Sequence, residues 1–242
     1  MKLAIVGHGR MGRMVEALAP AAGFTVCACI ARNTNENGAG LTREALKGAE
    51  VAIEFSAPTA AVHNIERLAM AGVSTVCGTT GWHSELARVK HQIARAGTGL
   101  VWGSNFSVGV NLFARVVAEA ARLFAEHPEY GAWAWEIHHA AKKDAPSGTL
   151  LQLVQQMERA GYSRPVNTAS SRAGAHPGTH EIGFDSPGDT ITLRHTSRNR
   201  EGFAQGALLA ARWIAGKRGV FEFKDVLFGE RSAKDKLKEQ QS

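Results

Sequence analysis

The first hundred residues alternate between short apolar runs and longer segments with helical periodicity. The apolar runs predict buried strands, and they cover residues 2–6, 25–31, 51–56, 73–82 and 100–107, the last two with the loop that follows the strand. Periodic segments near residues 59–71 and 83–96 predict helices between the later strands. This alternation predicts an α/β fold with a doubly wound parallel sheet, whose ligands bind outside the carboxyl ends of the strands.

A glycine-rich loop directly follows the first predicted strand. It reads Gly7-His8-Gly9-Arg10-Met11-Gly12 and opens a helix that continues through residues 15–19. Glycines at this spacing permit a tight turn, close approach of a pyrophosphate and close helix–strand packing. The loop therefore predicts a Rossmann-like dinucleotide site, with positive charge from Arg10 and Arg13 beside the phosphates. Further cofactor-binding candidates lie at the ends of later strands: Phe55, Ser56, Gly78, Thr79, Thr80, Ser104, Asn105 and Phe106.

The end of the second predicted strand bears on the choice of cofactor. NAD-selective folds often carry Asp or Glu there, which binds the ribose 2′-hydroxyl. This chain has Ala31-Arg32-Asn33 instead, and Arg32 could meet a 2′-phosphate. We therefore expect NADPH to be used at least as well as NADH, and the sequence leaves the choice between them open. The stretch from Arg32 to Glu50 is short for a complete strand–helix unit, so we expect an abbreviated adenosine end of the pocket.

The pattern changes after residue 105. Residues 132–137 carry bulky aromatics at alternate positions and 190–195 alternate in polarity, which predicts strands of a mixed or antiparallel sheet. Residues 150–157 read as a helix. We expect a dinucleotide-binding domain of residues 1–105 plus about 200–242, closed by a helix at 203–215 and by residues 220–227. A second, α+β domain of about 106–199 would bind substrate, and the polar tail 232–242 would be frayed.

The segment from Glu136 to Thr149 concentrates reactive and charged groups. His138 and His139 follow a predicted strand, and Lys142 lies four residues after His138. Histidine titrates near neutral pH, so a positioned imidazolium could donate a proton during catalysis. Ser147-Gly148-Thr149 opens the helix at 150–157, and a helix start with free N–H groups binds anions. The combination predicts an anionic substrate, of which a carboxylate is the favoured kind. Zinc is disfavoured because HExxH is absent and no cysteine is near.

Bulk properties narrow the choice of partners. The chain has 242 residues, a formal net charge of +6 and a pI near 9.5. Nucleic-acid binding is not expected, since no basic run with interleaved aromatics is present. We expect Cys27, Cys29 and Cys77 to be free core thiols, and we expect no metal site. We assign no site role to His176 and His180, in the predicted loop 174–183, although they could reach the substrate. Without a signal peptide or a membrane-length apolar run, we expect a cytoplasmic protein.

Together these parts resemble 4-hydroxy-tetrahydrodipicolinate reductase (dihydrodipicolinate reductase), a family of bacterial lysine and diaminopimelate synthesis. The family pattern E-x-H-H-x-x-K-x-D-A-P-S-G-T is matched by Glu136, His138, His139, Lys142, Asp144, Ala145, Pro146, Ser147, Gly148 and Thr149. Residues 78–81, 105–111 and 200–206 also look like family segments. The glycine loop is one residue tighter than in many family members, and the acidic residue often found after the second strand is missing.

The resemblance implies a reaction and roles for residues. It implies hydride transfer from NADPH or NADH to a cyclic, unsaturated dicarboxylate, with His138 as proton donor or acceptor and Lys142 as partner acid. The two are left open as the source of the proton. The resemblance also implies that substrate is bound by His139, Ser147, Gly148, Thr149 and Arg200. It implies that the sheets of the domain of about 106–199 associate, so that this domain also forms the oligomer, a homotetramer. The alternatives are another NAD(P)-dependent amino-dicarboxylate dehydrogenase and a non-catalytic NAD(P)-binding sensor.

Overall fold

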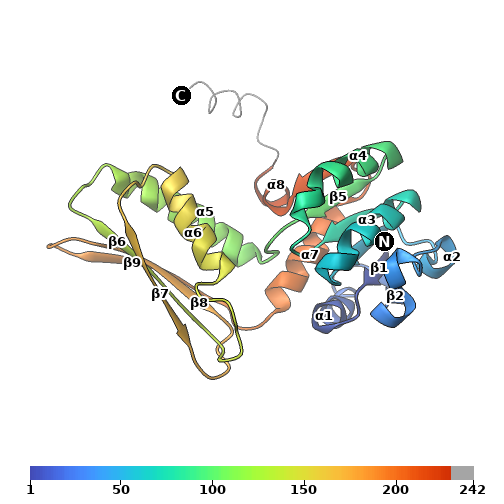
Figure 1. Ribbon diagram of the computed structural model, residues 1–242, viewed down its shortest axis with the longest axis horizontal. Coiled ribbons are helices and arrows are strands. Elements are labelled where there is room, and N and C mark those ends of the chain that lie inside the picture. Colours follow the sequence, from blue (N-terminus) through green and yellow to red (C-terminus); the bar gives the residue numbers. More distant parts are fainter. Residues whose placement is uncertain (230–242) are drawn as a thin grey trace. The chain divides into compact units, whose positions relative to one another are not determined.

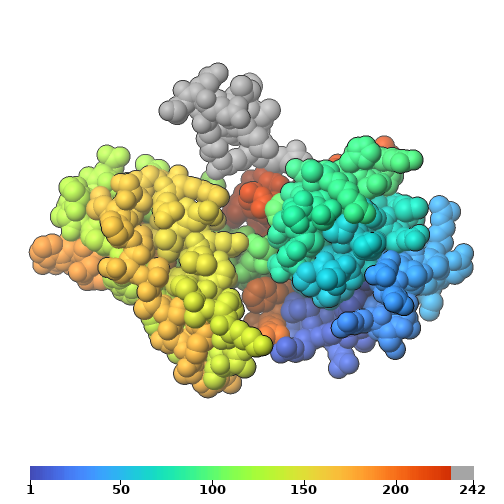
Figure 2. Space-filling view, viewed as in Figure 1, coloured from blue at the N-terminus to red at the C-terminus, as the bar shows by residue number. Residues whose placement is uncertain are grey.

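The computed structural model of the protein describes residues 1–229. These residues form two compact units (Figure 1). The first consists of Met1–Val108 with the described residues from Glu201 onward, and the second consists of Gly109–Arg200. In the space-filling view the first unit carries the blue-to-green and red parts of the chain, and the second carries the colours between them (Figure 2). The tail 232–242, which we expect to be frayed, lies outside the described residues.

The first unit is built on a parallel sheet. Its strands are β1 (Lys2–Val6), β2 (Thr25–Ile30), β3 (Val51–Glu54), β4 (Ser74–Cys77), β5 (Gly99–Trp102) and β10 (Gly219–Glu222). They lie in the order β10-β5-β4-β3-β1-β2, and every pairing is parallel. The chain changes winding direction between β1 and β3, and ligands of such sheets bind at that point. The predicted Rossmann-like sheet is confirmed.

Helices cover both faces of this sheet. α1 (Arg10–Leu18), α7 (Glu201–Ile214) and α8 (Phe223–Phe228) pack on one face, around side chains such as Ile5 and Ile53. α2 (Arg43–Leu46), α3 (Pro58–Met70) and α4 (Leu86–Ala96) pack on the other, around Val6, Leu68 and Leu100. Because both faces are buried, the central strands are apolar at nearly every position rather than alternating.

The connection from β2 to β3 contains no long helix. It holds two 3-10 turns, η1 (Arg32–Thr34) and η2 (Glu36–Gly38), followed by the four-residue helix α2. A third 3-10 turn, η3 (His83–Glu85), precedes α4. The β2–β3 connection is therefore shorter than a complete strand–helix unit.

The second unit is a mixed sheet covered by two helices. The sheet order is β7 (Val166–Arg172), β6 (Gly131–His138), β8 (Thr179–Asp185) and β9 (Thr190–Thr196), and only the β6–β7 pairing is parallel. α5 (Val108–Ala125) and α6 (Gly148–Arg159) pack on one face, around Ala134, Leu153 and Phe184. Figure 1 shows both helices on the same side of the sheet. The predicted mixed sheet is confirmed.

Strand β6 separates two chemically different faces. Ala132, Ala134, Glu136 and His138 are buried on the side of the helices, whereas Trp133, Trp135 and Ile137 are half-buried. Gly183 on β8 leaves room for the Trp133 ring, since a Cβ there would lie 2.1 Å from it. The bulky aromatics seen in the sequence therefore lie opposite the core.

Two expectations about these elements were wrong. The stretch 179–183, expected as part of a loop, lies within β8, where pairing with β6 and β9 supplies the hydrogen bonds that its short polar sequence does not announce. Cys29, expected in the core, is exposed because β2 is an edge strand, while Cys77 is buried and Cys27 half-buried. All three thiols are free.

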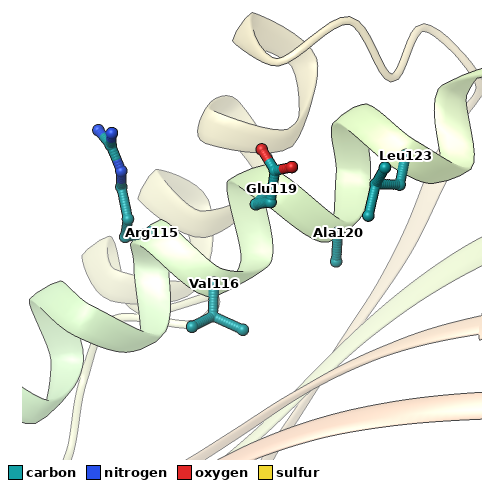
Figure 3. A pocket seen from close by; sticks show the side chains of 5 residues that line it. All are labelled: Arg115, Val116, Glu119, Ala120 and Leu123. Carbon is teal, nitrogen blue, oxygen red and sulfur yellow. The ribbon is translucent and has the colours of Figure 1, made fainter.

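No helix among residues 1–229 combines the length and apolarity needed to cross a membrane. A shallow hollow lies along the outer side of α5, lined by Arg115, Val116, Glu119, Ala120 and Leu123 (Figure 3). Its lining includes none of the candidate site residues.

Candidate active site

Glu136 lies at the centre of the polar cluster in the second unit. It is fully buried, because its position on β6 points to the helix-covered face. In the sheet register it stands between Ser170 of β7 and His180 of β8. Sheet pairing thus brings three segments of the chain together around one carboxylate.

Four donor groups saturate this carboxylate. The Ser147 N–H donates to Oε1 at 2.8 Å, Arg172 Nη2 at 2.8 Å and Ser170 Oγ at 3.0 Å, while Ser147 Oγ donates to Oε2. Burial alone would raise the pKa of Glu136, but the hydrogen bonds from Ser147 and Arg172 outweigh it and lower the pKa to about 2. Glu136 is therefore an anion at neutral pH and fixes the groups around it.

The start of α6 is held by this same anion. Ser147 is the N-cap of the helix, and its Oγ accepts a hydrogen bond from the Leu150 N–H at 3.2 Å. Gly148 is exposed, and a Cβ added to it would meet no atom within 4 Å. The first turn of this twelve-residue helix suits an anion, and the Asp144 carboxylate already accepts a hydrogen bond from its Gly148 N–H.

Two histidines flank the Glu136 carboxylate. His138 Nδ1 lies 3.6 Å and His180 Nε2 3.4 Å from Oε2, and the ring centroids are 5.1 Å apart. Burial lowers the pKa of His138, although Glu136 opposes the shift. Burial, with the neighbouring His138, lowers the pKa of His180 to about 4. Both rings are therefore neutral at pH 7 without a ligand, so the imidazolium expected from the sequence needs an added negative charge.

The remaining motif residues surround this cluster. Lys142 Nζ bonds both carboxylate oxygens of Asp144, at 2.7 and 2.9 Å, and lowers the pKa of Asp144. His139 and Thr149 are half-exposed. Arg200 lies exposed on the bend before α7 and takes no part in the Glu136 cluster. The second unit thus brings together His138, Lys142 and the start of α6, but not Arg200.

Three residues of this cluster had no site role assigned from the sequence, although His180 was noted as able to reach the substrate. Arg172 donates to Glu136 and also to the Asp144 carbonyl, so it links β7 to the loop that carries Lys142. His180 contacts Ser147 Oγ at 3.3 Å. Gly178 leaves room for the His138 ring, since a Cβ there would lie 3.0 Å from Nε2. The alternation of β6 could have placed Glu136 beside His138 on one face, but Arg172, His180 and Gly178 reach the site only through strand pairing.

The glycine loop of the first unit has the geometry of an anion site. Gly7 has φ +91°, and a Cβ there would lie 2.1 Å from the Phe55 carbonyl oxygen. A Cβ on Gly12 would lie 2.1 Å from the Gly7 carbonyl oxygen, so this glycine lets α1 approach the loop. Gly9, the N-cap of α1, meets no atom within 4 Å, and Arg10 follows it, exposed. The open side of the loop therefore lies at Gly9 and the helix start.

The other cofactor candidates lie on loops that interlock with this one. Gly78 accommodates the Phe55 ring, which packs edge-on to Phe106 with centroids 6.3 Å apart. The Ser56 N–H donates to Thr79 Oγ1 at 2.8 Å. His8 lies within hydrogen-bonding distance of Glu16, and Arg32 is exposed in η1. Met11 is half-buried against the core, whereas Thr80 and Ser104 are exposed and Asn105 is half-buried.

The cysteine and carboxylate positions bear on the expected absence of a metal. Glu136, His138 and His180 approach each other closely enough to ligate an ion, and so do His8, Glu16 and Cys29. In the first set Arg172 and Ser147 already occupy the carboxylate. We keep the expectation of a metal-free site as a prediction.

A parallel sheet with a glycine loop at its first helix, together with a unit that holds a buried histidine beside a helix start, is typical of a nucleotide-binding oxidoreductase. Family models agree with this class. Residues 1–106 match the model described as dihydrodipicolinate reductase, N-terminus, and residues 109–227 match dihydrodipicolinate reductase, C-terminus. The chain belongs to the dihydrodipicolinate reductase family, and the resemblance seen in the sequence is confirmed.

Individual relatives span nearly the whole chain. The 4-hydroxy-tetrahydrodipicolinate reductase of Christiangramia forsetii is 32% identical over 94% of this chain and 98% of its own length. That of Ralstonia nicotianae is 34% identical, over 94% and 99%. A solved structure of dipicolinate-bound dihydrodipicolinate reductase from Paenisporosarcina sp. TG-14 has a TM-score of 0.77 at 20% identity, covering 92% of this chain and 97% of the other. At that identity the structure supports the fold.

Proposed function

We propose that this protein reduces 4-hydroxy-tetrahydrodipicolinate to tetrahydrodipicolinate in diaminopimelate and lysine synthesis, with NADPH or NADH as hydride donor and with the 4-hydroxyl group leaving as water. The observation that carries the proposal is the complete Glu136–Thr149 motif arranged around one buried carboxylate. The family's curated members, named for this activity, support the substrate.

The substrate carboxylates bind at the start of α6 and at Lys142. The N–H groups of Gly148 and Thr149 have no partner within the helix, because the first turn of any helix lacks intrahelical acceptors for its donors. The Asp144 carboxylate accepts a hydrogen bond from the Gly148 N–H and stands where a substrate carboxylate would bind. Lys142 now holds the exposed Asp144 carboxylate, and a substrate carboxylate can replace it at little cost since such exposed pairs are weak. His139, half-exposed beside His138, completes the substrate side.

His138 handles the proton, with Lys142 as the alternative donor. In the free protein its ring is neutral, because burial lowers its pKa. A bound dianion would add negative charge beside the ring and raise that pKa, so the substrate itself would promote the imidazolium. Hydride addition would leave negative charge on the substrate ring, and a proton from the His138 imidazolium would then neutralise it.

The residues of the first unit fit a dinucleotide. Gly9 and the free N–H groups of α1 would hold the pyrophosphate, with Arg10 beside it, since no atom fills the space above Gly9. The rest of the dinucleotide site would be lined by residues at the ends of later strands: Phe55, Ser56, Gly78, Thr79, Thr80, Ser104, Asn105 and Phe106. When bound, the reduced nicotinamide supplies the hydride.

NADPH is the cofactor we favour. The residue after β2 is Ala31, and the exposed Arg32 begins η1 directly behind it. A guanidinium in that position can pair with a 2′-phosphate, whereas the carboxylate that would bind the NADH ribose is missing there. Comparing kcat/KM for the two cofactors tests this preference, which a strong bias toward NADH would exclude.

We further propose a homotetramer assembled through the second unit. The face of β6 away from α5 and α6 carries Trp133 and Trp135, two large side chains that are only half-buried within one chain. Tryptophan is enriched where protein surfaces meet. Light scattering of the wild type and of Trp135→Ala would test the assembly, and a wild-type monomer would exclude it.

A coupled assay tests the reaction. Dihydrodipicolinate synthase generates the substrate from pyruvate and aspartate semialdehyde. Oxidation of the cofactor is followed as the loss of reduced-nicotinamide absorbance, once with NADPH and once with NADH. Oxidation that needs both this protein and the synthase supports the proposal. No oxidation, with dinucleotide binding intact, would instead favour a dehydrogenase of another amino dicarboxylate or a non-catalytic sensor.

A further inference from the structure

Glu54 is a second fully buried carboxylate, at the carboxyl end of β3 in the first unit. It accepts hydrogen bonds at Oε1 from the Ser56 N–H at 3.1 Å, from Asn64 Nδ2 at 3.2 Å and from Ser56 Oγ. The Cys77 thiol donates to Oε2 at 3.1 Å. Among residues 1–229 no Lys, Arg or His side chain pairs with this carboxylate.

Burying an acidic group without a cation is expensive, and a core position on a central strand is ordinarily apolar. Packing alone therefore does not account for Glu54. A carboxylate offers about four acceptor sites, more than any apolar or amide side chain of its size. A carboxylate at the end of β3 can therefore accept hydrogen bonds from several segments of the chain at the same time.

The contacts of Glu54 extend to three loops. Ser56, which it holds, lies in the loop after β3, and the Ser56 N–H also reaches Thr79 in the loop after β4. Asn64 on α3 bonds Ser56 Oγ at 3.1 Å and accepts from Asn35 Nδ2 at 2.8 Å. Asn35 in turn accepts from the Gly40 N–H at 3.1 Å, within the shortened connection after β2. Glu54 and Asn64 thus fasten the ends of β2, β3 and β4 to one another.

We propose that Glu54, through Asn64, is a positioning residue that holds the β2, β3 and β4 loops in the geometry that binds the dinucleotide. The inference rests on the proposed use of NADPH or NADH, because those loops carry Arg32, Ser56 and Thr79. Glu54 itself is buried beneath them and touches no cofactor atom. Its loss should weaken cofactor binding while leaving the chemistry of the second unit unchanged.

The test measures direct NADPH binding, kcat and both KM values for Glu54→Ala, Glu54→Gln and Asn64→Ala. Ala removes every acceptor, and we expect NADPH Kd to rise roughly ten- to hundredfold, the cost of leaving a buried donor unsatisfied. Gln keeps one oxygen toward Ser56 and Asn64, so we expect it to restore Kd to within about threefold. At saturating NADPH, kcat and the KM for the cyclic substrate should stay within about twofold in all three variants.

Ile65→Ala supplies the matched control. Ile65 is the neighbour of Asn64 on α3 and is buried in the apolar core, so its truncation lowers Tm without touching the polar network. Compared at equal loss of Tm, Asn64→Ala should raise NADPH Kd and Ile65→Ala should not. If Glu54→Ala fails to fold, the comparison of Asn64→Ala with Ile65→Ala still tests whether the polar network positions the cofactor-binding loops.

The outcomes distinguish failure of the proposed function from failure of the positioning role of Glu54. Wild-type protein that binds neither NADPH nor NADH would overturn the proposed function. Wild-type protein that binds NADPH, with Asn64→Ala and any folded Glu54 variant unchanged in Kd, would overturn only the positioning role. Equal weakening by Asn64→Ala and Ile65→Ala at matched Tm would likewise reject it, because general destabilisation would then explain the loss.

Discussion

Arg172 and Glu136 form an ion pair across two parallel strands, with Nη2 2.8 Å from Oε1. The carboxylate is fully buried and the arginine side chain is 16% exposed. The same guanidinium donates to the Asp144 carbonyl, in the loop that carries Lys142. The pair therefore links the buried Glu136 of the candidate active site to the loop that would bind the substrate carboxylates.

Removing the arginine should leave an anion buried with too few partners. For Arg172→Met we expect a loss of about 3 kcal/mol in the free energy of unfolding, measured by urea denaturation. Arg194→Met is the control, because Arg194 pairs with Glu181 on the same sheet but is 59% exposed, and we expect it to cost less than about 1 kcal/mol. Equal costs in the two variants would contradict the importance of burial.

His138→Gln removes the proposed proton carrier. We expect kcat to fall roughly 10²- to 10⁴-fold, with Tm and NADPH Kd near wild-type values. The exposed His127, changed to Gln, should leave turnover intact. Near-normal turnover of the His138 variant would reject the role and point to Lys142.

Lys142→Ala should raise the KM for the substrate and lower kcat, because it removes both a carboxylate partner and a candidate acid. NADPH Kd should not change. Lys143→Ala is the matched control, since Lys143 is the exposed neighbour on the same loop, whereas the ion pair with Asp144 is made by Lys142. If the Lys142 variant instead loses cofactor affinity, its assignment is wrong.

The buried histidines should make the second unit sensitive to acid. The pKa of His180 is about 4 in the folded protein and near 6.5 in the unfolded chain. Between these values the unfolded chain binds a proton that the folded protein does not. Stability is therefore full above pH 6.5 and falls as pH drops toward 4, by up to about 1.4 kcal/mol per pH unit.

His180→Asn should flatten this dependence, measured by urea denaturation across the same pH range. His138, whose pKa is also lowered, acts with the same sign. The exposed His127→Asn should keep the wild-type slope. An unchanged slope in the His180 variant would mean that this ring is already protonated in the folded protein.

Local sequence patterns predicted several strands, the glycine loop and the central motif of the candidate site. Continuous apolar runs marked β1, β3 and β4 because both faces of the parallel sheet are covered, and the spacing of Gly7, Gly9 and Gly12 reports backbone requirements that lie within a single turn. The Glu136–Thr149 motif is local as well, since a strand end, a loop and a helix start follow one another along the chain.

The tertiary structure alone decided which residues complete the site. Arg172 and His180 meet Glu136 because β7 and β8 pair with β6, and pairing between strands leaves no mark at a fixed spacing in the sequence. The edge position of β2, which exposes Cys29, depends in the same way on the order of the whole sheet. The glycine loop, the Glu136–Thr149 motif and the alternation of strands and helices can be predicted from local sequence, because residues close together along the chain form them. Packing of distant strands set the partners of the groups that we propose to perform the chemistry, and with them the direction of their pKa shifts.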